Sequence, residues 1–191
     1  MQKTASVLAK ALTTNRILWA GFLGAVIVYG FTLEVIAASG SGLRGTPIGR
    51  SRAEQMPLSE DPLLAVIVLA AAGAAALGRI VPKLLLTPER LRAAAEDLRM
   101  ERRFSKADLE EIAALPDMER RPFYLLGAWS TACILRWAAY DAVGVFGLVL
   151  ALLRGSDPWV FAPFGAVSIA LLLTARPDLE ELHRLARSTR L

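Results

Sequence analysis

Apolar residues gather in four long blocks along the chain, with polar stretches between them. The blocks cover residues 17–38, 62–82, 123–153 and 159–174. A helix that crosses a bilayer needs about 20 mostly apolar residues, because the hydrocarbon layer is about 30 Å thick. Three blocks reach this length, and the fourth, with 16 residues, must thin the bilayer or rely on neighbouring helices. The pattern predicts an all-α integral membrane protein with four transmembrane helices.

Lysine and arginine predict how these helices are oriented. Sixteen of the 22 basic residues lie in segments 1–16, 83–122 and 175–191, and four lie in segments 39–61 and 154–158. Basic residues are enriched in the cytoplasmic loops of membrane proteins. We therefore expect the N-terminal arm, the middle segment and the C-terminal tail in the cytoplasm, and segment 39–61 as an external loop. Both termini on one side require an even number of crossings, which agrees with four.

The first block has a second interpretation, as a cleaved secretory signal. Ala37 and Ser39 resemble the small residues of a cleavage site. However, the apolar stretch has 22 residues, and Glu34 interrupts the approach to the site. A signal core usually has about 7–15 apolar residues. We therefore expect an uncleaved membrane anchor.

The middle segment, 83–122, predicts a cytoplasmic helical hairpin between the second and third spans. Thr87-Pro88-Glu89 supplies an N-cap, a proline at the first helical position and an acidic first turn. Ser105 and Asp108 form a capping-box-like pair before a second helix at 106–115. The segment holds nine basic and nine acidic residues. Two interpretations follow: solvated helices that pack on the membrane face, or a docking platform for a cytoplasmic partner.

The composition agrees with a membrane protein and narrows the partner classes. Hydrophobic residues make up 54% of the chain and the mean hydropathy is +0.44, whereas soluble domains contain about 45–50% apolar residues. The net charge is only +4, and no basic face interleaved with aromatic residues is found, so we expect no nucleic-acid partner. Eighteen arginines against four lysines, together with abundant alanine, indicate a bacterial protein from a GC-rich genome. We therefore expect the bacterial inner membrane.

The sequence contains none of the common catalytic motifs. A P-loop, a G-x-S-x-G elbow, an H-E-x-x-H helix and a dinucleotide fingerprint are all missing from it. The single histidine, His183, lies in the tail, and the single cysteine, Cys133, lies inside an apolar block. These two residue types therefore do not form a metal site. We expect a protein that is not an enzyme and that holds no metal or cofactor.

Four ionisable residues inside the apolar blocks remain as candidates: Glu34, Arg79, Arg136 and Asp141. The two arginines lie close enough to the inner boundary to extend to the interface, and Glu34 lies near the outer face. Asp141 is expected about 12 Å from the inner boundary, which its short side chain does not span. A charged aspartate at mid-helix costs about 2.5–3.5 kcal/mol on insertion scales. We therefore expect Asp141 to be protonated, paired or exposed to a water-filled crevice.

Three interpretations of Asp141 stay open. The first is a structural ion pair, for which Arg79 is the first candidate partner. Arg136 is the second candidate, although it points about 140° away on the same helix. The second interpretation is a hydrogen bond to a facing serine, threonine or tyrosine. The third is a proton or cation carrier, because a carboxylate in a low dielectric can cycle between its charged and neutral states.

Small residues lie in the same apolar blocks as Arg79 and Asp141. Gly144 and Gly147 follow Asp141 in the third block, and Gly73 and Gly78 lie in the second. Glycine allows the backbones of membrane helices to approach closely. We expect these four glycines to be helix-packing residues.

The stretches Leu109-Glu-Glu-Ile-Ala-Ala-Leu-Pro-Asp117 and Tyr140-Asp-Ala-Val-Gly-Val-Phe-Gly-Leu-Val-Leu-Ala151 resemble the ion-carrying proteolipid c subunit of rotary ATP synthases. The resemblance covers about residues 109–153. In that family a polar loop ending around a proline leads into a helix with an acidic residue, a small residue and then an aromatic-Gly-Leu-Val run. The resemblance implies that Asp141 is the ion-carrying carboxylate. The chain departs from the family by two additional spans and by about forty residues of charged segment in place of a compact loop.

Together these patterns predict a non-enzymatic, multi-pass inner-membrane protein that is an interaction or assembly component of a membrane complex. We expect it to contact the lipid bilayer and either a protein partner or further copies of itself. The alternative is proton or cation handling through Asp141.

Overall fold

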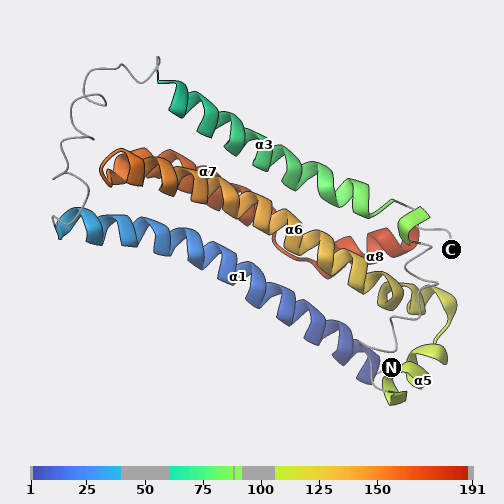
Figure 1. Cartoon of the computed structure of the whole chain (residues 1–191). Helices are drawn as coiled ribbons and strands as arrows, with labels where there is room; N and C mark the ends of the chain where they lie inside the picture. The colour runs from blue at the N-terminus through green and yellow to red at the C-terminus, as the bar shows by residue number, and fades with distance from the viewer. Residues whose placement is uncertain (1, 40–60, 88, 92–105, 189–191) are drawn as a thin grey trace. The chain divides into compact units, whose positions relative to one another are not determined.

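The computed structural model describes residues 2–39, 61–87, 89–91 and 106–188, and its regular elements are all α-helices (Figure 1). No strand occurs in these ranges, which confirms the predicted all-α class. The helices are α1 (Gln2–Ala38), α3 (Pro62–Leu85), α5 (Lys106–Ala113), α6 (Asp117–Leu153), α7 (Pro158–Thr174) and α8 (Leu179–Ser188).

Three helices are long and apolar enough to cross a membrane. Their qualifying stretches are Val7–Ala38, Pro62–Leu85 and Glu119–Leu153. The α7 helix has only 17 residues and qualifies only together with α8, as a bent pair. The described part of the chain therefore contains three candidate spans, and a fourth if α7 and α8 form one broken span.

The polar ends of two helices were not expected from the apolar pattern. Residues 2–16, predicted as an arm, belong to α1, and α6 begins at Asp117, six residues before the third apolar block. Backbone hydrogen bonds continue a helix beyond its apolar stretch wherever the polar residues find partners. Asn15, which is 2% exposed, has such a partner: its Oδ1 accepts a hydrogen bond from the Ser130 hydroxyl at 2.8 Å.

The hairpin predicted in 83–122 is described only in part. Its second helix, α5, agrees closely with the predicted 106–115. Most of its first helix falls in residues 92–105, outside the described residues.

The chain divides into two compact units, and the division falls within α1, α3 and α6. Unit 1 comprises residues 1–19, 80–136 and 176–191, and unit 2 comprises residues 20–79 and 137–175.

Small residues form the packed centre of unit 2. Ala71 and Ala74 of α3 are buried against Val143 of α6. Larger apolar side chains, including Phe146 and Phe164, pack around this group. Alanines at the contact let the helix axes approach, as is common where helices pack in a bilayer.

Two of the four predicted packing glycines are tightly enclosed. A Cβ atom on Gly147 would overlap the Cβ of Phe164 in α7, and one on Gly78 would overlap the ring of Tyr140. Gly144 has ordinary contacts, with the Ser168 hydroxyl 3.4 Å from the position of a Cβ. Gly73 has no heavy atom within 4 Å of that position, so it packs against none of the described residues there.

A tight turn connects α6 to α7. The amide of Ser156 donates to the carbonyl of Ala151 at 2.8 Å, and the amide of Gly155 donates to Leu152 at 3.3 Å, which is the Schellman pattern. Gly155 has a φ of 86°, a conformation that glycine adopts without strain. Asp157 then caps α7 by accepting from the amide of Trp159 at 3.0 Å.

The C-terminal helix α8 belongs to unit 1 and was expected only as a tail. Leu182 and Ala186 are buried on one side, whereas His183 and Arg187 are exposed. The helix begins behind Asp178, whose carboxylate accepts from the amide of Glu180 at 3.1 Å. The apolar spacing and this N-cap are the signals that the sequence offered for α8.

Candidate functional site

Asp141 lies in unit 2 and is hydrogen bonded to a tyrosine. The hydroxyl of Tyr29, on α1, donates to the Oδ2 atom of Asp141, on α6, at 3.3 Å. Both side chains are partly buried. The contact connects two helices whose residues lie 112 positions apart in the sequence.

The second carboxylate oxygen of Asp141 is still able to accept a hydrogen bond. Oδ1 is buried and receives no hydrogen bond from the described residues. No ion pair joins Asp141 to Arg79 or Arg136, although both arginines are described, and Arg79 is exposed. Of the two structural interpretations of Asp141, the described residues therefore show the hydrogen bond to a facing tyrosine and not the ion pair with an arginine.

Arg136 has a different partner, in unit 1. Its guanidinium lies 3.3 Å from the Oε1 atom of Glu181, on α8. The other oxygen of Glu181 accepts from the indole N–H of Trp129, also at 3.3 Å. One carboxylate thus holds two side chains of α6, and the rotation of Arg136 away from Asp141 explains why these two residues do not pair.

The polar groups next to Asp141 are used to hold α7 in place. The hydroxyl of Ser168 donates to the backbone carbonyl of Tyr140 at 2.7 Å, and Ser168 is fully buried. The indole N–H of Trp137 donates to the carbonyl of Ala175, just after α7, at 2.8 Å. Both donors are satisfied by backbone acceptors, so these contacts are structural and leave Asp141 as the group with an unused acceptor.

A second polar contact in unit 2 joins the start of α3 to the end of α6. Asp61 forms an ion pair with Arg154 and accepts from the amide of Leu63 at 2.9 Å. Desolvation raises the pKa of the Asp61 carboxyl. The hydrogen bonds from Arg154 and Leu63 and the charge of Arg154 outweigh that effect and lower the pKa below its ordinary value.

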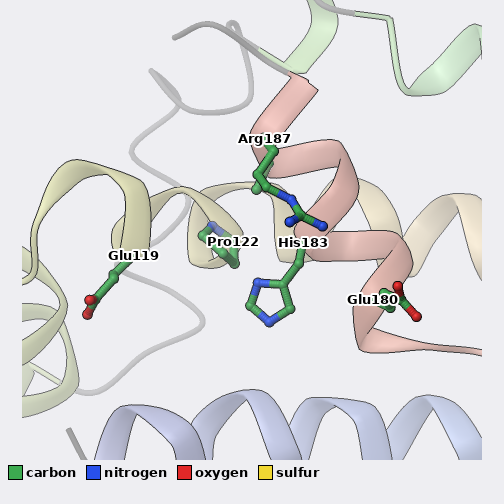
Figure 2. Close-up of a pocket in the computed structure, with 6 residues that line it drawn as sticks. Glu119, Pro122, Glu180, His183 and Arg187 are labelled. Atoms are coloured by element: carbon green, nitrogen blue, oxygen red, sulfur yellow. The ribbon is translucent and has the colours of Figure 1, made fainter.

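An open cavity of about 510 Å³ lies in unit 1 between the start of α6 and α8. Figure 2 shows the imidazole of His183 pointing out of α8 beside Pro122, with the guanidinium of Arg187 next to it. Glu119 and Glu180 complete the charged part of the lining, which therefore carries both signs. Among the described residues, no group of three His, Cys, Asp or Glu side chains is arranged to hold a metal ion.

Sequence reasoning missed Tyr29 and Glu181, the two side chains that organise these contacts. Tyr29 is the single phenol in the first apolar block, and a buried phenol usually finds a hydrogen-bond partner. Glu181 lies in the first turn of a helix with apolar residues at helical spacing. These were the available signals, but neither identifies the partner.

Comparisons of the chain with protein-family models, with curated proteins and with solved structures find no significant match.

Proposed function

We propose that the chain is a multi-pass protein of the bacterial inner membrane with four crossings and both termini in the cytoplasm. The lengths of the helix segments in unit 2 support this proposal. The segments are 20–38, 62–79, 137–153 and 158–174, or 17 to 19 residues each. At about 1.5 Å per residue they measure about 26–29 Å, close to the thickness of the hydrocarbon layer.

Reporter fusions test this topology. Fusions after Ala114 and after Ser188 are expected to report the cytoplasm, and a fusion within residues 40–60 is expected to report the outside. An external signal after Ala114 would contradict the proposed hairpin position. A mature chain that begins near residue 40 would contradict the uncleaved anchor.

Within that membrane, we propose a non-enzymatic role as an interaction or assembly component of a membrane complex. The observation that carries this role is the anchoring of α8 through Glu181, which accepts from Trp129 and pairs with Arg136. Leu182 and Ala186 bury the inner side of the helix. The opposite side exposes charged and polar groups: Glu180, His183, Arg184 and Arg187.

A helix fixed in this way is a better docking surface than a free tail. A partner that binds a flexible segment must order it, which costs part of the binding free energy. Here the burial of α8 and the contacts of Glu181 order the helix in advance. The acidic and basic side chains beside the cavity can each pair with an opposite charge on a partner. Because both signs are present, this surface does not strongly attract either cations or anions from a distance.

Site-specific photo-cross-linking tests the role. A photoreactive residue at position 183 is expected to give one discrete adduct with a second protein in the native membrane. A matched residue at Leu69, which is 71% exposed on α3, serves as the control and is expected to label lipid. Only lipid adducts at both positions would contradict the role.

A second candidate function, proton or cation handling, is favoured by the unpartnered Oδ1 of Asp141. A buried carboxyl without a basic neighbour can hold a proton, and the resemblance of residues 109–153 to the c subunit agrees with this function. A hydrophobic carbodiimide is expected to modify Asp141 faster at low pH, where the acid is protonated. Asp141→Asn should abolish the labelling and Glu34→Gln should not. No labelling at any pH would refute the second candidate.

A further inference from the structure

One side of α1 in unit 2 is not covered by the described residues. It carries Ala20, Gly24, Ile27, Phe31, Glu34 and Ala38, and we refer to these six residues as the α1 seam. Ile27 is 59% exposed and Phe31 is 69% exposed. Ala20, Glu34 and Ala38 are also exposed, and a Cβ atom on Gly24 would meet nothing within 4 Å.

The spacing along the α1 seam is 4-3-4-3-4, the repeat by which two helices pack over a long distance. The residues also change in size along it. Ala20 and Gly24 allow a close approach at one end, and Ile27 and Phe31 supply bulk in the middle. An exposed apolar side is ordinary for a lipid-facing helix, so the spacing alone does not identify a partner.

Glu34 distinguishes the α1 seam from a lipid-facing side. It lies four residues before Ala38, about 6 Å along the helix axis, between the exposed Phe31 and Val35. No hydrogen bond or ion pair joins it to the described residues. At this depth, near the outer face, the carboxylate can extend toward the interface. Even so, ionisable residues in transmembrane segments almost always face the bundle interior, a water-filled cavity or a pairing group. Glu34 instead faces away from the bundle of its own chain.

We propose that the α1 seam binds a transmembrane helix of a partner protein, and that this helix carries a lysine or arginine at the depth of Glu34. The inference rests on the proposed role as an assembly component and specifies the chemistry of the partner. A cation at that depth would pair with the carboxylate, while the partner helix covers Ile27 and Phe31.

A second copy of the chain does not fit the α1 seam. All copies insert in the same orientation, so two α1 helices that meet through this surface run parallel. A two-fold axis between them would then place Glu34 opposite Glu34. Like charges in contact oppose association, whereas a basic residue on a different helix favours it.

The test uses a single-span probe helix co-expressed with the full chain. The probe is a leucine–alanine helix with a basic cytoplasmic flank and one lysine at the depth of Glu34. A matched probe has glutamine at that position. Energy transfer between fluorescent proteins on the cytoplasmic ends reports association. We expect the lysine probe to associate about tenfold more strongly than the glutamine probe, because a hydrogen bond to a charged group is the stronger interaction.

Three variants of the full chain complete the test. Glu34→Gln is expected to reduce association of the lysine probe to the level of the glutamine probe, and Phe31→Ala is expected to weaken both. Leu69→Ala, on the exposed side of α3, is the control and should change neither. Equal association of both probes, or no effect of Glu34→Gln, would overturn the proposal. Self-association of the chain that Phe31→Ala abolishes would also overturn it. A partner adduct at position 183 combined with failure here would retain the assembly role and remove only the α1 seam.

Discussion

At Asp141, the two carboxylate oxygens have different surroundings. Oδ2 accepts from Tyr29, and the buried Oδ1 accepts from none of the described residues. The hydrogen bond to Oδ2 holds α1 to α6 in unit 2. The other oxygen, Oδ1, can take up a proton without breaking that hydrogen bond, because a protonated carboxyl still has an oxygen that accepts from the tyrosine.

Tyr29→Phe removes the donor and is expected to lower the free energy of unfolding by about 0.5–1.5 kcal/mol, the usual value of one hydrogen bond. Asp141→Asn keeps a carbonyl acceptor and is expected to remain closer to the wild type. Thermal unfolding in detergent measures both. If Tyr29→Phe has the same effect in an Asp141→Leu background, the two side chains are not coupled.

Gly147 and Gly73 give a matched pair of glycine substitutions. Gly147→Ala places a methyl group against the Cβ of Phe164, which the backbone of α7 holds in position. Overpacking of this kind costs about 1–3 kcal/mol. Gly73→Ala enters open space and is expected to be neutral or slightly stabilising. Equal unfolding temperatures for the two variants would contradict the close approach of α6 and α7.

The sequence identified Asp141 but not its partner, for a physical reason. Depth in a membrane follows from counting residues along one helix, so a mid-block carboxylate stands out. Tyr29 lies 112 positions away, and its approach depends on how α1 and α6 are rotated against each other. Similarly, Arg79 was the first candidate partner of Asp141 because it lies on the adjacent helix, yet it is on the exposed side of α3.

Glu181 joins α8 to α6 through two polar contacts. Glu181→Ala would leave the guanidinium of Arg136 and the indole N–H of Trp129 without their acceptor. Because this carboxylate is 36% exposed, we expect a modest cost of about 1–2 kcal/mol. Faster hydrogen exchange of the amides in 179–188 is the expected signature. Glu180→Ala, on the exposed side, is the control, and equal exchange in both variants would show that Glu181 does not anchor α8.

The Asp61–Arg154 pair gives the start of α3 a dependence on pH. Because the folded state lowers the pKa of Asp61, the pair stabilises the protein fully above the unfolded pKa of about 3.9. That contribution is lost as the pH falls through the lower, folded pKa. The difference in unfolding temperature between the wild type and Asp61→Asn should be constant near neutral pH and shrink below about pH 4. A difference that is independent of pH would contradict the pair.

Helix boundaries were predictable where local signals coincide with the end of an apolar block. The α7 helix begins one residue before the predicted position, because Asp157 caps it and Pro158 fits its first turn. The α6 helix ends at the predicted Leu153, where Gly155 permits the turn. The polar starts of α1 and α6 were missed, and for α1 the reason is a tertiary partner: Asn15, before the apolar block, accepts a hydrogen bond from Ser130.

The side-chain polar contacts of the two units join different kinds of helix. In unit 2 they join apolar helices, through the hydroxyl of Ser168, the indole of Trp137 and the carboxylate of Asp141. In unit 1, Glu181 orders α8 and leaves its charged side exposed. This difference supports our proposals that unit 2 anchors the protein in the membrane and that α8, in unit 1, offers a docking surface to a partner.

If the protein belongs to a larger membrane complex, as we propose, the mass of the assembly that contains it will show a second protein. Native mass spectrometry of the full chain, extracted from its own membrane with surrounding lipid, gives that mass. We expect a species that contains the 20.6 kDa chain and at least one different protein. The double variant His183→Glu with Arg187→Glu should release the chain, and Leu69→Ala should not. A species of one chain alone, or of identical copies only, would contradict the claim.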